Sequence, residues 1–208
     1  MTPEPTPQLL LVVLAGPNGA GKSTFYEHHL ARSSLPFVNA DVIAREHFGP
    51  EAAAKAREAA RISDEVRTEL VNQRRSFIFE TVLSDPVGDK VAFFREARAA
   101  GYFLDVHFIG LASPLLSLSR VTDRVRAGGH DVPDEKLASR YPRTLENLVR
   151  LLDAADRLQI YDNSEATRPH CIVAMLERGI LLAAADPLPS WLAPVPLASR
   201  RTPHTQPL

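Results

Sequence analysis

The chain has 208 residues, of which 45% are hydrophobic and 24% are charged. This balance is typical of a globular protein and excludes a fully disordered chain, and the length predicts one compact domain with short appendages. The formal net charge is −1, so no overall positive field attracts nucleic acid or an anionic membrane, and neither is expected as a partner. Cys171 is the only cysteine, which excludes a disulfide framework and a cysteine-rich zinc site. We therefore expect a cytoplasmic protein.

The first apolar run, residues 9–15, predicts a buried strand. It is far shorter than the roughly 20 residues that span a bilayer. An acidic, proline-rich segment precedes it, where a signal peptide would carry positive charge.

Short apolar runs alternate with longer helical patterns along the rest of the chain. Strands are predicted at residues 9–14, 36–39, 77–79, 102–109 and 158–161. Helices are predicted from 22, at 41–47, 51–74 and 91–100, from 113, and at 134–152. Residues 170–176 and 180–185 predict a β-hairpin.

This order predicts an α/β fold with three layers, α/β/α, around a mainly parallel five-stranded sheet, followed by the hairpin. Prolines gather at both ends of the chain. We expect an irregular arm at residues 1–7, one domain at 8–186, and a proline-rich tail at 187–208. Ligands of such sheets bind beyond the carboxyl ends of the strands, so the chemistry is expected just after each apolar run.

A phosphate-binding loop follows the first strand. Its sequence matches G-x-x-x-x-G-K-S/T between a strand and a helix, and its residues are Gly16, Pro17, Asn18, Gly19, Ala20, Gly21, Lys22, Ser23 and Thr24. Glycines let backbone N–H groups converge on phosphate oxygens, Lys22 reaches the β- and γ-phosphates, and the Ser23 hydroxyl is placed to ligate Mg²⁺. The alternative is a glycine-rich turn with a chance lysine, but strand, spacing and helix all favour a nucleoside-triphosphate site.

Acidic residues follow the second and third strands. Asp41 is placed to accept the proton of an attacking hydroxyl, although aspartate is also a good helix N-cap, and the two interpretations remain open. Glu80 ends the third strand, where it could hold a Mg²⁺-bound water or hydrogen-bond a substrate hydroxyl; a solvent-exposed glutamate is the alternative. The Thr81 hydroxyl is placed to assist, and it is also a common packing residue in strands.

An arginine-rich segment at residues 120–143 suggests a helical lid. Arg120 and Arg124 share a helical face, Arg126 follows, and Arg140 comes after a Gly-Gly-His sequence that ends at His130. Guanidinium groups on a closing segment stabilise the charge of a transferring phosphoryl group. A solvated helix with pairs such as Asp123 with Arg126 is the alternative. No second histidine lies at ligand spacing, so His130 indicates a substrate or hinge contact rather than a metal ligand.

Together, these motifs resemble the zeta toxin family, in particular its short single-domain bacterial branch, over about residues 8–190. The resemblance is carried by the phosphate-binding loop and by an ordered series of short motifs, namely Asn-Ala-Asp at 39–41, Phe-Glu-Thr at 79–81, residues 128–133, Arg-Tyr-Pro-Arg at 140–143, and Tyr-Asp-Asn-Ser at 161–164.

The resemblance implies a P-loop kinase that uses ATP and Mg²⁺ to phosphorylate the 3′-hydroxyl of the aminosugar in UDP-N-acetylglucosamine, with an antitoxin protein as a candidate partner. It implies that Lys22 and Ser23 hold nucleotide and metal, that Asp41 is the base, and that Glu80 with Thr81 contacts the sugar. Arg124 matches one phosphate-binding arginine. The remaining expected contacts with phosphate, substrate or nucleotide are Asn39, Arg120, Arg126, His130, Arg140 and Asn163.

Four assignments stay open. Arg126, His130 and Arg140 compete for the second phosphate contact. Asn163 follows the fifth strand, where related kinases approach adenine, or it belongs to an Asx turn. The acceptor is UDP-N-acetylglucosamine, or another metabolite, nucleoside or antibiotic. A nucleotide-dependent switch that acts through a partner is the alternative to a kinase.

Overall fold

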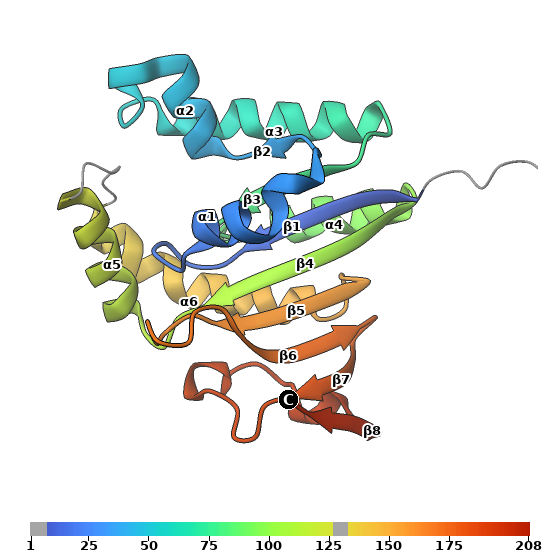
Figure 1. Ribbon diagram of the computed structural model, residues 1–208. Helices are drawn as coiled ribbons and strands as arrows, with labels where there is room; N and C mark the ends of the chain where they lie inside the picture. The colour runs from blue at the N-terminus through green and yellow to red at the C-terminus, as the bar shows by residue number, and fades with distance from the viewer. Residues whose placement is uncertain (1–7, 127–132) are drawn as a thin grey trace, which may run out of the picture.

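The computed structural model describes residues 8–126 and 133–208. One sheet runs through the molecule in the order β2-β3-β1-β4-β5-β6-β7-β8 (Figure 1). Its strands are β1 (Leu9–Ala15), β2 (Phe37–Val38), β3 (Phe77–Thr81), β4 (Tyr102–Gly110), β5 (Arg157–Asp162), β6 (Cys171–Glu177), β7 (Ile180–Ala184) and β8 (Arg201–Pro207). The first five strands in this order are parallel, and β6 and β7 form the antiparallel hairpin. The predicted α/β class with a mainly parallel sheet is confirmed, but the sheet has eight strands rather than five, because the hairpin and β8 extend it beyond β5.

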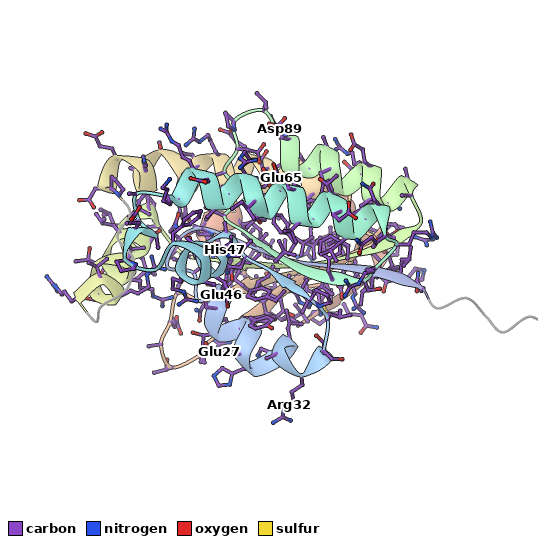
Figure 2. All side chains as sticks on the ribbon, turned by 90° about the horizontal axis from the view of Figure 1, so that it is seen from above. Glu27, Arg32, Glu46, His47, Glu65 and Asp89 are labelled. Carbon is purple, nitrogen blue, oxygen red and sulfur yellow. The ribbon has the colours of Figure 1, made fainter. Side chains whose placement is uncertain are left out.

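Helices cover both faces of the sheet. They are α1 (Lys22–Phe25), which continues as a π-helical segment at Tyr26–Leu30, then α2 (Ala40–Phe48), α3 (Ala56–Asn72), α4 (Asp89–Ala99), α5 (Pro114–Arg126) and α6 (Asp134–Leu151). Seen from above, Glu65 and Asp89 lie on the side opposite to Glu27 and Arg32 (Figure 2). Within the described residues, no helix has the length and apolar character needed to cross a membrane.

The continuous apolar sequence of the central strands reflects burial on both faces, as is usual for parallel sheets. Along β1, Leu11 and Val13 pack with residues of α4 and α6 in one core cluster. Leu14 points to the other face and packs with Phe25 after the phosphate-binding loop. The two clusters fix β1 between its helices, and with it the start of the loop.

The proline-rich C-terminal segment is more ordered than the sequence suggests. After β7 the chain returns over the core, and β8 pairs with β7 in parallel at the edge of the sheet, as the eighth strand. The prolines of this segment argue against a strand at the level of sequence. An edge strand nevertheless tolerates proline, because one side of the strand forms no hydrogen bonds to a neighbouring strand. Trp191 is 6% exposed and stacks on Phe108. A Cβ at Gly110 would lie 2.1 Å from the Trp191 ring, so the ring covers the carboxyl end of β4 directly.

Trp191→Ala should lower the free energy of unfolding by about 3–5 kcal/mol, because it opens a cavity beside Phe108. Thermal unfolding followed by circular dichroism measures the effect. Leu208→Ala is the control, since Leu208 is largely exposed and its loss should be nearly neutral. Equal melting of Trp191→Ala and wild type would show that the segment is not part of the core.

An ion pair between a buried aspartate and a more exposed arginine joins β4 to β5. Asp105 is 4% exposed and accepts a hydrogen bond from Nε of Arg157 at 2.8 Å. His107, the next residue on the same face of β4, lies 3.7 Å from the Asp105 carboxylate and contacts the Tyr161 hydroxyl. Burial by itself would raise the pKa of Asp105, but Arg157 and His107 outweigh it and lower that pKa from 3.8 to about 2.

This depressed pKa makes part of the stability depend on pH. The folded state favours ionised Asp105, so the contribution is fully present above pH 3.8 and is lost as the pH falls toward 2; it amounts to about 2 kcal/mol. Urea unfolding at pH 6 and pH 2 should therefore show a smaller acid loss in Asp105→Asn than in wild type. Asp123→Asn, which removes an exposed partner of Arg126, should leave the acid loss nearly unchanged.

Candidate functional site

The phosphate-binding loop connects β1 to α1 through close backbone approaches. Gly16 has φ +140°, and a Cβ there would lie 2.0 Å from the carbonyl oxygen of Ile109 on β4. Gly21 has φ +86°, and a Cβ there would lie 2.5 Å from the Asn163 amide nitrogen. Only glycine fits these two positions without moving β4 or the segment after β5. The loop is therefore shaped by its neighbours as well as by its own sequence.

Lys22 points back into this loop. It is 7% exposed, and its ammonium group donates to the carbonyl oxygens of Gly16 at 2.9 Å and Pro17 at 3.1 Å. The Glu80 carboxylate lies 3.8 Å away. Burial lowers the pKa of Lys22, and the charges of Glu80 and Asp41 act against that shift. A cation is thus held at the point where the motif predicts phosphates.

Asn39 organises the two acids. Its side-chain oxygen accepts from the backbone N–H groups of Asp41 at 2.7 Å and Val42 at 3.2 Å, so Asn39 is the N-cap of α2. Its amide nitrogen donates to Glu80 at 2.7 Å. The interpretation of Asp41 as the cap is therefore wrong. Because Asn39 satisfies the end of the helix, the exposed Asp41 carboxylate is left for other contacts.

Glu80 and Thr81 end β3 at the same edge. Glu80 is 12% exposed, which excludes the alternative of a solvated glutamate. Burial raises the pKa of Glu80, and the charge of Lys22 opposes the rise. The Thr81 hydroxyl accepts a hydrogen bond from the backbone N–H of Leu83 at 2.9 Å. Its own proton can still be donated, because a hydroxyl group both donates and accepts.

Substitution of Asn39 separates its role as the N-cap of α2 from its hydrogen bond to Glu80. Asn39→Ala should cost about 1 kcal/mol more in unfolding free energy than Asn39→Ser, because serine keeps an N-cap oxygen and alanine does not. Both variants lose the amide donor to Glu80. Chemical denaturation of the two variants beside wild type measures the difference. If serine and alanine destabilise equally, capping is not what Asn39 contributes.

Helix α5 packs directly on the phosphate-binding loop. The buried Ser117 hydroxyl donates to the carbonyl oxygen of Asn18 at 2.6 Å. Three residues later, the Arg120 guanidinium donates to the carbonyl oxygen of Ser164 at 3.3 Å. Arg120 therefore lies toward the segment after β5. Ser117 is a contact that sequence reasoning missed, since a serine inside a helix gives no signal of its own.

The other arginines of the predicted lid differ in their exposure and in the charges around them. Arg124 is exposed, and its charge lowers the pKa of Lys22. Arg126 is exposed and pairs with Asp123 at 3.4 Å, as in the solvated-helix alternative. Burial and then the charge of Arg143 lower the pKa of Arg140, whereas Asp41 raises it. His130 lies outside the described residues.

The segment after β5 contacts the phosphate-binding loop at Ala20 and Gly21. Asn163 is buried; its amide nitrogen donates to the Ala20 carbonyl oxygen at 2.9 Å, and its oxygen accepts from the His170 backbone at 3.1 Å. The His170 ring contacts the Gly21 carbonyl oxygen at 3.3 Å. An Asx turn is present, but it belongs to Asp162, which accepts from Ser164. The role of His170 was not predicted, because its sequence neighbours carry no motif.

A cavity of about 710 Å³ extends from the loop and the two acids toward α3 and α6. Its lining includes Asn39, Asp41, Glu80, Thr81 and Arg140. The described residues contain no group of three or more His, Cys, Asp or Glu side chains that could hold a metal ion by themselves. The site thus combines the buried ammonium group of Lys22, the carboxylates of Asp41 and Glu80, and open space for a second molecule.

This sheet order, with a phosphate-binding loop after β1 and acids after β2 and β3, is the fold of P-loop kinases. The model of the Zeta toxin family matches residues 2–171. The chain belongs to the zeta toxin family. No curated protein matches the sequence at a significant level.

Solved structures resemble the fold. The PezAT toxin–antitoxin system of Streptococcus pneumoniae includes a chain that matches with a TM-score of 0.56 and 18% identity, over 83% of this chain and 72% of that one. AvrRxo1-ORF1:-ORF2 with ATP matches with a TM-score of 0.59 and 17% identity, over 84% of this chain and 60% of that one. A putative kinase from Chloroflexus aurantiacus matches with a TM-score of 0.50 and 15% identity, over 66% and 79%.

Proposed function

We propose that the protein transfers the γ-phosphate of ATP to a hydroxyl group of a small molecule. The observation that carries this proposal is the cavity that is lined both by the exposed residue Asp41 and by Asn18 of the phosphate-binding loop. A switch that only hydrolyses ATP has no need of a second large site there. Membership of the zeta toxin family supports the same reaction class.

ATP binds with its phosphates in the loop at residues 16–24. Backbone N–H groups and the first turn of α1 contact the phosphate oxygens, and Lys22 exchanges the Gly16 and Pro17 carbonyl oxygens for the β- and γ-phosphates. The exposed Ser23 hydroxyl fits Mg²⁺, which takes few protein ligands and is completed by water and phosphate oxygens. When bound, Mg²⁺ neutralises charge on the β- and γ-phosphates.

Asp41 acts as the general base that takes the proton of the acceptor hydroxyl. Asn39 fixes Asp41 at the start of α2, and the same amide orients Glu80. Beside the reacting hydroxyl, the Glu80 carboxylate accepts a hydrogen bond from the substrate, and the Thr81 hydroxyl donates one to it. Positioning of this kind, rather than covalent chemistry, supplies most of the catalysis of phosphoryl transfer.

Arg124 and Arg140 stabilise the charge on the transferring group. Arg140 lines the cavity together with Asp41, and the charges of both arginines act on Lys22, which supports this assignment. Arg120 and Asn163 act on the nucleotide side of the site. Arg120 contacts the segment after β5, and Asn163 contacts the phosphate-binding loop. Arg126 and His130 are secondary candidates for contacts made when the lid closes.

The acceptor that we propose first is UDP-N-acetylglucosamine, phosphorylated at the 3′-hydroxyl of its aminosugar. Family membership supports this choice, and a cavity of about 710 Å³ has the size of sites that hold drug-sized ligands. Another metabolite, a nucleoside or an antibiotic is the alternative. The toxin–antitoxin system of the pneumococcal neighbour makes an antitoxin protein a candidate partner.

Asp41→Asn should lower turnover by about 10²–10⁴-fold while ATP affinity stays unchanged, because the base is lost and the loop is intact. Lys22→Ala should instead abolish ATP binding. The assay incubates each protein with ATP, Mg²⁺ and a panel of UDP-sugars and nucleosides, and mass spectrometry detects the gain of one phosphate. Titration with a fluorescent ATP analogue measures affinity. A panel without product, together with ATP hydrolysis that survives Asp41→Asn, would favour the switch.

A further inference from the structure

We propose that Ser117 and Asn163 are positioning residues of the phosphate-binding loop. Each holds one carbonyl group of the loop from outside and thereby turns the N–H group of the same peptide toward the phosphates of ATP. Ser117 acts on the N–H of Gly19, and Asn163 acts on that of Gly21. Neither side chain belongs to the loop motif, which ends at residue 24. This inference deepens the proposed function and rests on it for the ligand, a nucleoside triphosphate.

The two glycines have the backbone that binds anions. Gly19 and Gly21 are left-handed, with φ of +70° and +86°. Left-handed residues that alternate with right-handed ones make successive N–H groups converge on one point, and phosphate-binding loops use this concave arrangement. In the described part of the chain, no backbone carbonyl accepts a hydrogen bond from the N–H group of either glycine. Both groups can therefore donate to a phosphate.

The direction of each N–H group is set by the carbonyl group of the same peptide. A trans peptide is planar, and its C=O and N–H bonds point in opposite directions. The Asn18 carbonyl shares a peptide with the N–H of Gly19, and the Ala20 carbonyl shares one with the N–H of Gly21. A donor that holds either carbonyl from outside the loop therefore turns the paired N–H group inward.

The Ser117 hydroxyl is the donor for the first of these peptides. It donates to the Asn18 carbonyl oxygen at 2.6 Å, and Ser117 is 2% exposed. Helix α5 approaches so closely here that a Cβ at Gly19 would lie 2.9 Å from the Ser117 carbonyl oxygen. No other donor reaches the Asn18 carbonyl among the residues that the structure describes. The direction of this peptide thus depends on one hydroxyl group.

The Asn163 side chain is the donor for the second peptide. Its amide nitrogen donates to the Ala20 carbonyl oxygen at 2.9 Å, and Asn163 is 9% exposed. Its side-chain oxygen accepts from the backbone N–H of His170 at 3.1 Å, and its own backbone N–H donates to the Gly110 carbonyl oxygen at 3.0 Å. Both ends of the amide have the partner that their chemistry requires, so its orientation is fixed.

The following peptide of the loop is held differently. The Gly21 carbonyl oxygen accepts from the backbone N–H of Phe25 at 2.9 Å and contacts the His170 ring at 3.3 Å. The bond from Phe25 belongs to the first turn of α1, so the helix holds this carbonyl even without the histidine. The N–H of Lys22, which shares this peptide, therefore does not depend on a single distant side chain. In contrast, the N–H groups of Gly19 and Gly21 each depend on one.

Fixed N–H groups make phosphate binding stronger. Donors that already point at the anion need no reorganisation when it binds, and a loop that is ordered beforehand loses less conformational entropy. Loss of the Ser117 or Asn163 donor should therefore weaken phosphate binding, although neither side chain needs to touch a phosphate.

The first test follows the two N–H groups separately. Tripolyphosphate with Mg²⁺ is added to isotope-labelled protein, and the amide resonances of Gly19 and Gly21 in wild type should move on binding. At saturation, Ser117→Ala should reduce the change at Gly19 more than that at Gly21, and Asn163→Ala should do the reverse. A general disturbance of the loop would affect both amides alike. Equal effects of each variant on both amides, or no effect of either variant, would overturn the inference.

The second test measures affinity by calorimetry, with tripolyphosphate and with ATP in the presence of Mg²⁺. Ser117→Ala and Asn163→Ala should each weaken both affinities by about 3–10-fold, which is the effect of one lost hydrogen bond. Thr122→Ala is the matched control, because it removes a hydroxyl of α5 that donates to the Leu118 carbonyl oxygen of its own helix at 3.0 Å. This control should bind as tightly as wild type. Wild-type affinity in both loop variants would refute the inference.

Neither measurement needs an acceptor, so the positioning role and the proposed kinase can fail separately. Weaker binding with the two amide-specific effects, but no phosphorylated product from any acceptor, would support the positioning role and refute the kinase. Phosphorylation of an acceptor by Ser117→Ala and Asn163→Ala at the wild-type KM for ATP would refute the positioning role and leave the kinase standing.

Discussion

The site depends on keeping one ammonium group charged inside the protein. Lys22 is almost fully removed from solvent, and burial of an uncompensated cation is expensive. Two loop carbonyls and the Glu80 carboxylate compensate it. These same partners tie the loop to β3, and through Asn39 they tie β3 to α2. The position of the acids is therefore coupled to the position of the lysine before any nucleotide arrives.

Most of the architecture follows from patterns that are local in the sequence. The phosphate-binding loop, the five parallel strands and the hairpin are all visible as apolar runs bounded by turn residues, and each lies within a few residues of its predicted place. Asp41 and Glu80 were each predicted as site residues, because ligands of parallel sheets bind beyond the carboxyl ends of the strands. The structure places both on the same cavity.

The features that were missed depend on contacts between distant segments. Asn39 rather than Asp41 caps α2, a choice between neighbours that only the helix geometry decides. Ser117 and His170 contact the site from positions without a motif. β8 contains two prolines, so its sequence favours a tail, and only the open edge of β7 makes it a strand.

The family match ends at residue 171, where β6 begins. Apolar residues between Val173 and Leu197, including Trp191 over β4, nonetheless belong to the same core cluster as the central strands. Domain boundaries drawn from family similarity would thus cut the sheet in two. A protein expressed only to residue 171 would lack Trp191 and so expose Phe108 to solvent. Such exposed apolar surface favours aggregation, which the full chain avoids.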